Sequence, residues 1–210
     1  GVPGTRPAKV AVIGAGVAGA NAVVIAAGMG ADVTVLDTNL YRLRELDDHY
    51  NGRVKTIVSN TFELNRAVAE ADLVIGAVLI PGAKAPKLVT NEMVKNMKPG
   101  SVLVDIAIDQ GGCFADSHPT THADPTFKVH NSVFYCVANM PGAVPHTSTY
   151  ALTNATLPYV RALANHGWLA ACRADGSLAL GLNVHAGQVT NAGVAEAHSL
   201  PEQKLTDALA

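Results

Sequence analysis

Short apolar runs alternate with stretches of helical periodicity over the first two thirds of the chain. Several runs consist of Val, Ile and Leu without polar alternation, a pattern typical of strands that are covered on both faces of a sheet. Strand, helix and strand repeated in this way predict an α/β fold, a Rossmann-type doubly wound parallel sheet with right-handed crossovers. The predicted strands are 10–13, 32–36, 54–58, 73–77, 101–106 and 134–137, with helices near 17–29, 40–49, 62–70 and 91–97.

The pattern changes after residue 145. A helix is predicted from a cap at Thr147 or Ser148 to His166, with Gly167 as its stop. Pro158 lies inside this span, so we expect a kink or two helices there. Beyond residue 175 the periodicity is too weak to predict elements. We therefore place the sheet domain at residues 1–145 and a helical carboxyl-terminal segment, part of an incomplete second domain, at 146–210.

The charges of the chain nearly balance. Its 210 residues include 15 Lys and Arg and 17 Asp and Glu, which gives a net charge of −2. This balance argues against a nucleic-acid partner and against a polybasic membrane surface. Gly, Asp and Pro interrupt every apolar run before the roughly 18 residues that a membrane-spanning helix requires. The first ten residues also lack the pattern of a secretory signal.

Three cysteines bear on the compartment and on metal binding. Cys113, Cys136 and Cys172 cannot all pair with one another, and their spacing matches no zinc-ligand pattern. We expect three buried thiols in a reducing cytoplasm.

A glycine-rich segment carries the first functional signal. Gly14, Gly16 and Gly19 form a Gly-x-Gly-x-x-Gly motif directly after the first predicted strand and at the start of a predicted helix. Gly14 would permit the tight turn, Gly16 the approach of a pyrophosphate, and Gly19 close packing of helix on strand. The free amides of the helix start would meet the phosphate charge. The alternative is a purely structural strand-to-helix turn.

An acid follows this motif at the expected distance. Asp37 ends the second predicted strand, where its carboxylate can accept both hydroxyls of a ribose. A 2′-phosphate there would face the same negative charge, so NAD is favoured over NADP. Arg42 lies five residues further on and either lies along the adenosine or is a solvated helix residue.

Ligands of doubly wound sheets bind beyond the carboxyl ends of the strands. The segments 78–79, 106–109 and 137–140 follow predicted strands and are expected around this crevice.

Three further segments resemble NAD-dependent L-alanine dehydrogenase: GAVLIPGAKAP at 76–86, VDIAIDQGGC at 104–113 and NMPGAVP at 139–145. The resemblance runs from residue 1 to about 185. The alpha subunit of the proton-translocating nicotinamide nucleotide transhydrogenase shares this architecture, but segment 147–154 resembles the dehydrogenase.

The resemblance implies specific contacts with NAD. His118 stands where relatives can carry arginine, and as a largely neutral side chain near pH 7 it is a weaker phosphate donor. Some relatives carry a metal-binding acid and histidine one helical turn apart. The matching positions here are Ala162 and His166, and since alanine cannot ligate we predict no metal. The full set of expected cofactor contacts, which includes the three glycines of the motif, is Gly14, Gly16, Val17, Ala18, Gly19, Asp37, Arg42, Ser59, Val78, Leu79, Ile106, Ala107, Ile108, Asp109, His118, Val137, Ala138, Asn139 and Met140.

The same resemblance implies the reaction, oxidative deamination of L-alanine to pyruvate and ammonium. Asp109 matches a catalytic carboxylate of the family, placed to orient water or the imine. Asp105, within the preceding strand, is the competitor, and we expect it to make a structural hydrogen bond instead. In the family an amino-terminal domain supplies a lysine, an arginine and a histidine for the substrate, and these 210 residues begin after that domain. Alone, the chain is expected to bind NAD and to turn over poorly.

Two alternatives remain: the transhydrogenase alpha subunit and a catalytically silent NAD-binding module. Family members commonly form hexamers, so the resemblance implies a homo-oligomer. Only 15% of the residues are charged, where about 25% is usual. We attribute this shortage to apolar surface that packs against the missing domain and neighbouring subunits, and predict exposed leucine and valine side chains after Pro145.

Overall fold

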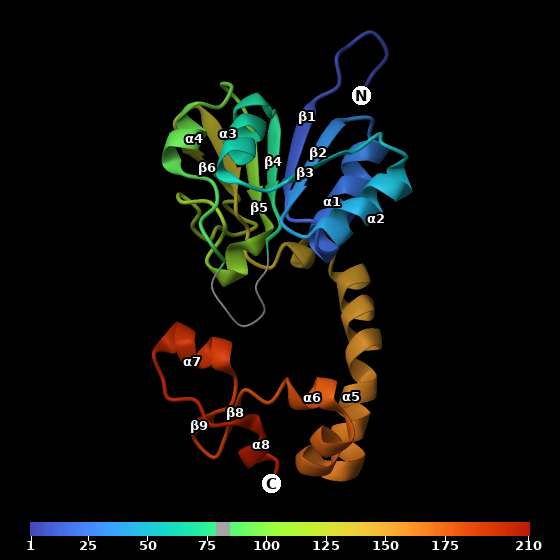
Figure 1. The fold of residues 1–210 in the computed structure, drawn as a ribbon, viewed down its shortest axis with the longest axis vertical. Coiled ribbons are helices and arrows are strands. Elements are labelled where there is room, and N and C mark those ends of the chain that lie inside the picture. The colour runs from blue at the N-terminus through green and yellow to red at the C-terminus, as the bar shows by residue number, and fades with distance from the viewer. Residues whose placement is uncertain (79–84) are drawn as a thin grey trace. The chain divides into compact units, whose positions relative to one another are not determined.

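The computed structural model describes residues 1–78 and 85–210 and divides them into two compact units, one of residues 1–78 and 85–140 and one of residues 141–210. The first unit is built on a seven-stranded sheet of order β3-β2-β1-β4-β5-β7-β6 (Figure 1). All neighbours pair in parallel except β6 and β7. The strands are β1 (Lys9–Ile13), β2 (Asp32–Asp37), β3 (Lys55–Val58), β4 (Leu73–Gly76), β5 (Val102–Asp105), β6 (Thr126–Val129) and β7 (Ser132–Tyr135).

Helices cover both faces of this sheet. They are α1 (Val17–Gly28) and α2 (Leu40–Tyr50) on one face and α3 (Thr61–Glu70) and α4 (Asn91–Lys95) on the other (Figure 1). The packing of β1 explains why it is apolar from Val10 to Ile13: Val10 and Val12 pack in the cluster under α1 and α2, and Ala11 and Ile13 pack under α3 and α4. The predicted doubly wound α/β sheet is therefore confirmed.

The helices begin where short polar side chains accept backbone N–H groups. Asn39 caps α2, Asn60 caps α3 and Thr90 caps α4, each through a side-chain oxygen. Such caps satisfy amides that the helix itself leaves unpaired. The caps at Asn39 and Asn60, two residues after the ends of β2 and β3, fix the starts of α2 and α3, which sets the geometry of that edge of the sheet.

Two differences from the predicted sheet concern β7 and β5. The segment predicted as strand 134–137 is β7, which begins two residues earlier at Ser132, and an unpredicted strand, β6, pairs with it in antiparallel fashion. The strand predicted at 101–106 ends at Asp105, because Ile106 begins a 3-10 helix, η1 (Ile106–Gln110).

The second unit begins with η2 (Met140–Ala143), which straddles the boundary, and the long helix α5 (Pro145–Ala174). Proline occupies the first position of α5, so the expected cap at Thr147 or Ser148 is wrong. The break expected at Pro158 lies instead at Gly167, the predicted stop, where the backbone turns to φ +74°. The unpredicted remainder forms α6 (Gly176–Ala179), β8 (Val184–His185), β9 (Gln188–Val189), α7 (Ala192–His198) and α8 (Leu205–Ala208).

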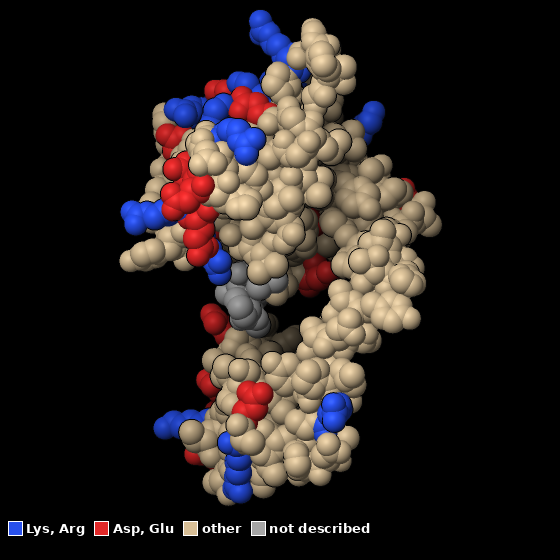
Figure 2. Space-filling view, turned by 90° about the vertical axis from the view of Figure 1, so that its right-hand side faces the viewer, with Lys and Arg blue, Asp and Glu red and all other residues tan. Residues whose placement is uncertain are grey.

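Helix α5 is weakly charged and exposes apolar side chains. Arg161 and Arg173 are the charged residues among its 30, and its visible surface in Figure 2 carries few blue or red atoms. Leu152 is 65% and Val160 55% exposed, and Leu180 beyond the helix is 71% exposed. The predicted exposure of leucine and valine after Pro145 is thus confirmed. In the part of the chain that the structure describes, no helix is both long and apolar enough to cross a membrane.

Cys113, Cys136 and Cys172 are all buried and unpaired, as predicted. Burial, with a smaller effect of the neighbouring Asp105 carboxylate, raises the pKa of the Cys113 thiol above its ordinary range. Burial likewise raises the pKa of Cys136 to about 11.

Candidate functional site

The candidate residues gather where the parallel strands of the first unit end. The registers pair Ile13 with Leu36 and with Gly76, and Gly76 with Asp105, so the ends of β1, β2, β4 and β5 lie level. The order of the strands reverses beside β1, between β2 and β4. Such a reversal opens a crevice at the carboxyl edge of a doubly wound sheet. This edge is therefore the candidate site.

The glycine loop between β1 and α1 has the geometry that its sequence predicts. Gly14 has φ +103°, and a Cβ there would stand 2.7 Å from the carbonyl oxygen of Ala77 at the end of β4. A Cβ on Gly19 would stand 1.8 Å from the carbonyl oxygen of Gly14. Glycine is required at both positions because the loop and the first turn of α1 are packed directly on backbone.

The start of α1 is open. Apart from Gly16, its chain neighbours and the adjacent helix backbone, no described atom lies within 4 Å of the place where a Gly16 Cβ would stand, and no side chain caps the helix. Val17 is 80% exposed, and Ala18 is exposed beside it. An uncapped helix start carries free N–H groups and partial positive charge. The loop therefore fits the pyrophosphate of a dinucleotide.

Asp37, half-buried at the end of β2, ties this loop to the neighbouring strand. Its Oδ2 accepts the N–H of Ala15 at 2.6 Å, and its Oδ1 accepts the N–H of Asn39 at 2.7 Å. Each carboxylate oxygen can accept more than one hydrogen bond, so both remain able to receive ribose hydroxyls. The backbone N–H of Ser59 donates to the carbonyl of Asp37 at 2.9 Å, which brings this candidate contact to the same edge.

Arg42 lies on the exposed surface of α2. Its guanidinium pairs with Glu45, one turn further along the helix, at 3.2 Å. This contact matches the solvated-helix alternative, and the contact of Arg42 with the adenosine stays a prediction.

The two aspartates at the end of β5 have different environments. Asp109 is exposed on η1, which follows β5 directly at this edge of the sheet. Asp105 is fully buried and accepts hydrogen bonds from the backbone of Ala107, Cys113 and Phe114. The expectation that Asp105 makes structural hydrogen bonds is confirmed.

Some candidate contacts from the resemblance lie further out. The ring of His118 stacks on Phe127 of the edge strand β6, with ring centroids 3.7 Å apart, so its contact with a phosphate stays a prediction. After β7, Val137 is buried, whereas Ala138 and Asn139 are exposed at the site edge. Val78, Ile106 and Met140 are half-buried, Ala107 and Ile108 are buried, and Leu79 lies outside the described residues.

One residue of this edge was not predicted from the sequence. The ammonium of Lys87 donates to the carbonyl oxygens of Gly111 at 2.6 Å and Phe114 at 3.0 Å. It thereby braces the turn that follows η1. No periodicity or motif in the sequence identifies it, because its partners lie more than 20 residues away.

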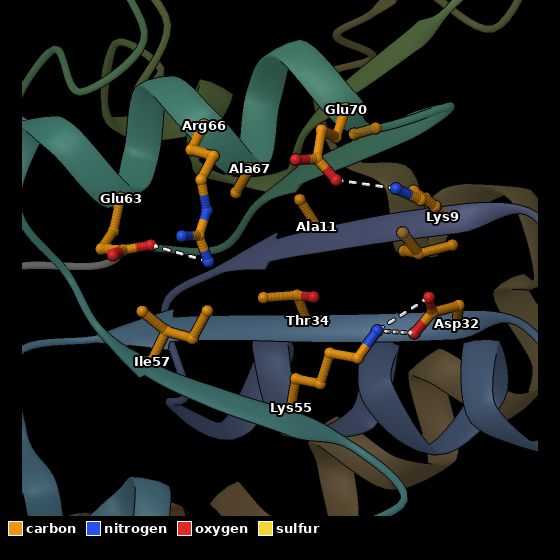
Figure 3. Close-up of a pocket in the computed structure, with 12 residues that line it drawn as sticks. Lys9, Ala11, Asp32, Thr34, Lys55, Ile57, Glu63, Arg66, Ala67 and Glu70 are labelled. Atoms are coloured by element: carbon orange, nitrogen blue, oxygen red, sulfur yellow. Dashed lines mark hydrogen bonds and ion pairs between the residues drawn. The ribbon is translucent and has the colours of Figure 1, made fainter.

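A cavity of about 360 Å³ lies between α3 and the strands β1, β2 and β3 (Figure 3). Its charged lining residues form pairs: Lys9 with Glu70 at 2.7 Å, Lys55 with Asp32 at 2.6 Å and Arg66 with Glu63 at 3.4 Å. The hydrogen bond and charge of Lys9 lower the pKa of Glu70. None of the predicted cofactor residues lines this cavity. The described residues contain no group of three or more His, Cys, Asp or Glu arranged to hold a metal ion.

Comparison with known proteins identifies the family of the chain. Alanine dehydrogenase of Mycolicibacterium smegmatis is 64% identical over 201 residues, which are 96% of this chain and 54% of that protein. A solved structure of L-alanine dehydrogenase matches with a TM-score of 0.83 and 48% identity, covering 100% of this chain and 56% of that one. The chain thus spans about half the length of the relatives it matches.

A transhydrogenase from Sinorhizobium meliloti matches less completely. Its structure gives a TM-score of 0.63 at 30% identity and covers 70% of this chain and 42% of that one. The family model described as "Alanine dehydrogenase/PNT, C-terminal domain" matches residues 1–192. The chain therefore belongs to the alanine dehydrogenase/PNT C-terminal domain family, whose dinucleotide-binding fold implies a nicotinamide cofactor.

Proposed function

We propose that this chain supplies the cofactor-binding part of an NAD-dependent alanine dehydrogenase, which converts L-alanine, NAD and water to pyruvate, ammonium and NADH. The observation that carries the proposal is the open glycine loop beside Asp37, with Asp109 on the same edge of the sheet. The likeness to L-alanine dehydrogenase over the whole chain supports the substrate.

The cofactor is NAD rather than NADP in this proposal. The first turn of α1, at Val17 and Ala18, would hold the pyrophosphate, and Asp37 would accept the ribose hydroxyls. A 2′-phosphate would be placed against the Asp37 carboxylate, whose two oxygens already order the loop. When bound, the nicotinamide ring supplies the two-electron acceptor for the substrate.

Asp109 is the proposed acid/base of this chain. Its exposed carboxylate at the end of β5 can take a proton from the water that attacks the substrate imine and return it later. The other candidate contacts on η1 and after β7 would line the nicotinamide end of the crevice.

The cations for the substrate carboxylate are proposed to lie in the half of the relatives that this chain does not match. Lys87, which lies beside η1, is already bound to two carbonyl oxygens. We further propose that residues 146–210 belong to the substrate domain of a cytoplasmic homo-oligomer. The exposed apolar side chains of α5 would be covered there by the other half of the protein or by neighbouring subunits.

The first experiment measures cofactor binding by the 210-residue chain. Titration with NADH and NADPH, followed by nicotinamide fluorescence, is expected to show preference for NADH. Equal affinity for both, or binding of neither, would contradict the proposed cofactor.

The second experiment measures the reaction in a chimera of the amino-terminal half of the M. smegmatis alanine dehydrogenase and this chain. Alanine-dependent NADH formation is expected, with a loss of about 100-fold or more in kcat for Asp109→Asn, the usual range for an acid/base. Asp124→Asn, an exposed acid on a loop, is the matched control.

The same chimera separates the alternatives. No alanine-dependent turnover in a folded chimera would favour the silent NAD-binding module. Reduction of an NADP analogue by NADH, on addition of a transhydrogenase partner subunit, would favour the transhydrogenase alpha subunit.

A further inference from the structure

The buried carboxylate of Asp105 is the centre of the loop that follows β5. It has no exposed surface, and its two oxygens receive hydrogen bonds from both ends of that loop. Oδ1 accepts the N–H of Ala107 at 3.1 Å and lies 3.5 Å from the Cys113 thiol. Oδ2 accepts the N–H of Cys113 at 2.8 Å, the N–H of Phe114 at 3.2 Å and the hydroxyl of Ser117 at 2.5 Å.

These partners lie on either side of Asp109. Ala107 precedes it on η1, and Cys113, Phe114 and Ser117 follow it, so one carboxylate holds both ends of the segment 106–117. A carboxylate accepts hydrogen bonds at both oxygens, which suits a group surrounded by donors. Hydrogen bonds to a charged acceptor are also stronger than those between neutral groups.

The turn after Asp109 passes directly beside the Asp105 carboxylate. Gly112 has φ +75°, and a Cβ there would stand 2.7 Å from Oδ2 of Asp105 and 2.7 Å from the Cβ of Ser117. From another side, Lys87 holds the carbonyls of Gly111 and Phe114. The loop that bears Asp109 is therefore fixed by the buried Asp105 carboxylate and by Lys87.

We propose that Asp105 is a positioning residue, which sets the place of the Asp109 carboxylate by holding the N–H of Ala107 and the turn at 111–117. This inference rests on the proposed function of Asp109. It goes beyond it in assigning a role in the reaction to a side chain that is buried in the core.

The substitution Asp105→Asn tests the proposal with little change of shape. An amide presents one acceptor and one NH₂ donor. If the amide oxygen takes the place of Oδ2, it still accepts the hydrogen bonds of Cys113, Phe114 and Ser117. The NH₂ group then faces the N–H of Ala107, and because both are donors that hydrogen bond is lost. The opposite orientation would lose three partners. The expected change is therefore confined to the start of η1, the helix that carries Asp109.

The experiment is a double-mutant cycle of Asp105→Asn and Asp109→Asn in the chimera. If Asp105 acts through Asp109, the two losses overlap: Asp105→Asn lowers kcat by about tenfold or more, and adding it to Asp109→Asn lowers kcat by less than about threefold. The KM for NAD is expected to change less than kcat, because the loop at 14–19 and Asp37, which would hold the pyrophosphate and the ribose, lie on other strands. Multiplicative losses would overturn the proposal.

A second readout does not depend on activity. Amide hydrogen exchange of Ala107 in the 210-residue chain is expected to speed up by about tenfold or more in Asp105→Asn, because its acceptor is lost. Ser101→Ala is the matched control: this buried hydroxyl precedes β5 at its other end and donates to Lys98 and Ala71. It should lower stability while leaving kcat and the exchange of Ala107 unchanged.

The outcomes separate this inference from the proposed function. If Asp109→Asn leaves turnover intact, the role of Asp109 fails. If Asp109→Asn abolishes turnover and Asp105→Asn does not lower it, the positioning role of Asp105 fails alone. Should Asp105→Asn not fold, as judged by circular dichroism, the cycle is run with Ser117→Ala, which removes one donor and leaves the carboxylate. A loss of kcat that overlaps with Asp109→Asn is again expected, and unchanged kcat overturns the proposal.

Discussion

At the scale of single residues, the glycine motif separates packing from binding. Gly16→Ala adds a methyl group in open space, so we expect an unchanged melting temperature and a loss of NADH affinity of about tenfold or more, since the methyl group stands where the phosphates would bind. Gly19→Ala places its methyl group 1.8 Å from the Gly14 carbonyl oxygen and should destabilise the fold by about 1–3 kcal/mol. Thermal unfolding and NADH titration of both variants test this. A lower melting temperature for Gly16→Ala would contradict it.

Asp37 combines two roles that a single substitution can separate. Asp37→Asn keeps one oxygen for the N–H of Ala15 but removes the negative charge that would face a 2′-phosphate. We expect the preference for NADH over NADPH to fall by about tenfold, which corresponds to about 1.4 kcal/mol of lost repulsion between the half-buried carboxylate and the 2′-phosphate. Fluorescence titrations with the two cofactors measure the ratio, and Asp48→Asn on exposed α2 is the control. An unchanged ratio would remove Asp37 from cofactor selection.

At the scale of elements, the reactivity of the buried Cys136 thiol, directly after β7, measures how well the core excludes solvent next to the site. Because burial raises the pKa of Cys136 to about 11, its thiol stays protonated at pH 9, where an unfolded cysteine is about half ionised. We expect alkylation at pH 9 to be at least about tenfold slower in the folded chain than in urea. The raised pKa also means that its contribution to stability is present below pH 9 and is lost as the pH rises toward 11. Rapid labelling of Cys136 in the native chain would contradict this packing.

The elements also show what the sequence could predict. Strands such as β1 are apolar on both faces, and the glycine motif has a fixed spacing, so local pattern was enough to place them. Strand β6 reads Thr-Phe-Lys-Val and is exposed at alternate positions at the edge of the sheet, so no long apolar run identified it. The hydrogen bonds of Asp105 and Lys87 were not specified in advance because their partners are set by how the loops fold back.

At the scale of the whole molecule, the two units offer separate probes. The single tryptophan, Trp168, lies in the second unit, where its ring is 4.4 Å from that of His185. Every predicted cofactor contact that the structure describes lies in the first unit. NAD at about 100 times its Kd should stabilise that unit by about 2.7 kcal/mol, which corresponds to a shift of roughly 5–10 °C.

We therefore expect NAD to raise the unfolding transition that circular dichroism records for the sheet, while the transition of Trp168 fluorescence stays in place. The Gly16→Ala variant is the control, because it should fold normally and show neither shift. Equal shifts of both signals would mean that the two units unfold as one. In that case the second unit owes its stability to the first, since it buries few apolar side chains of its own, among them Ala171, Ala179 and Val189.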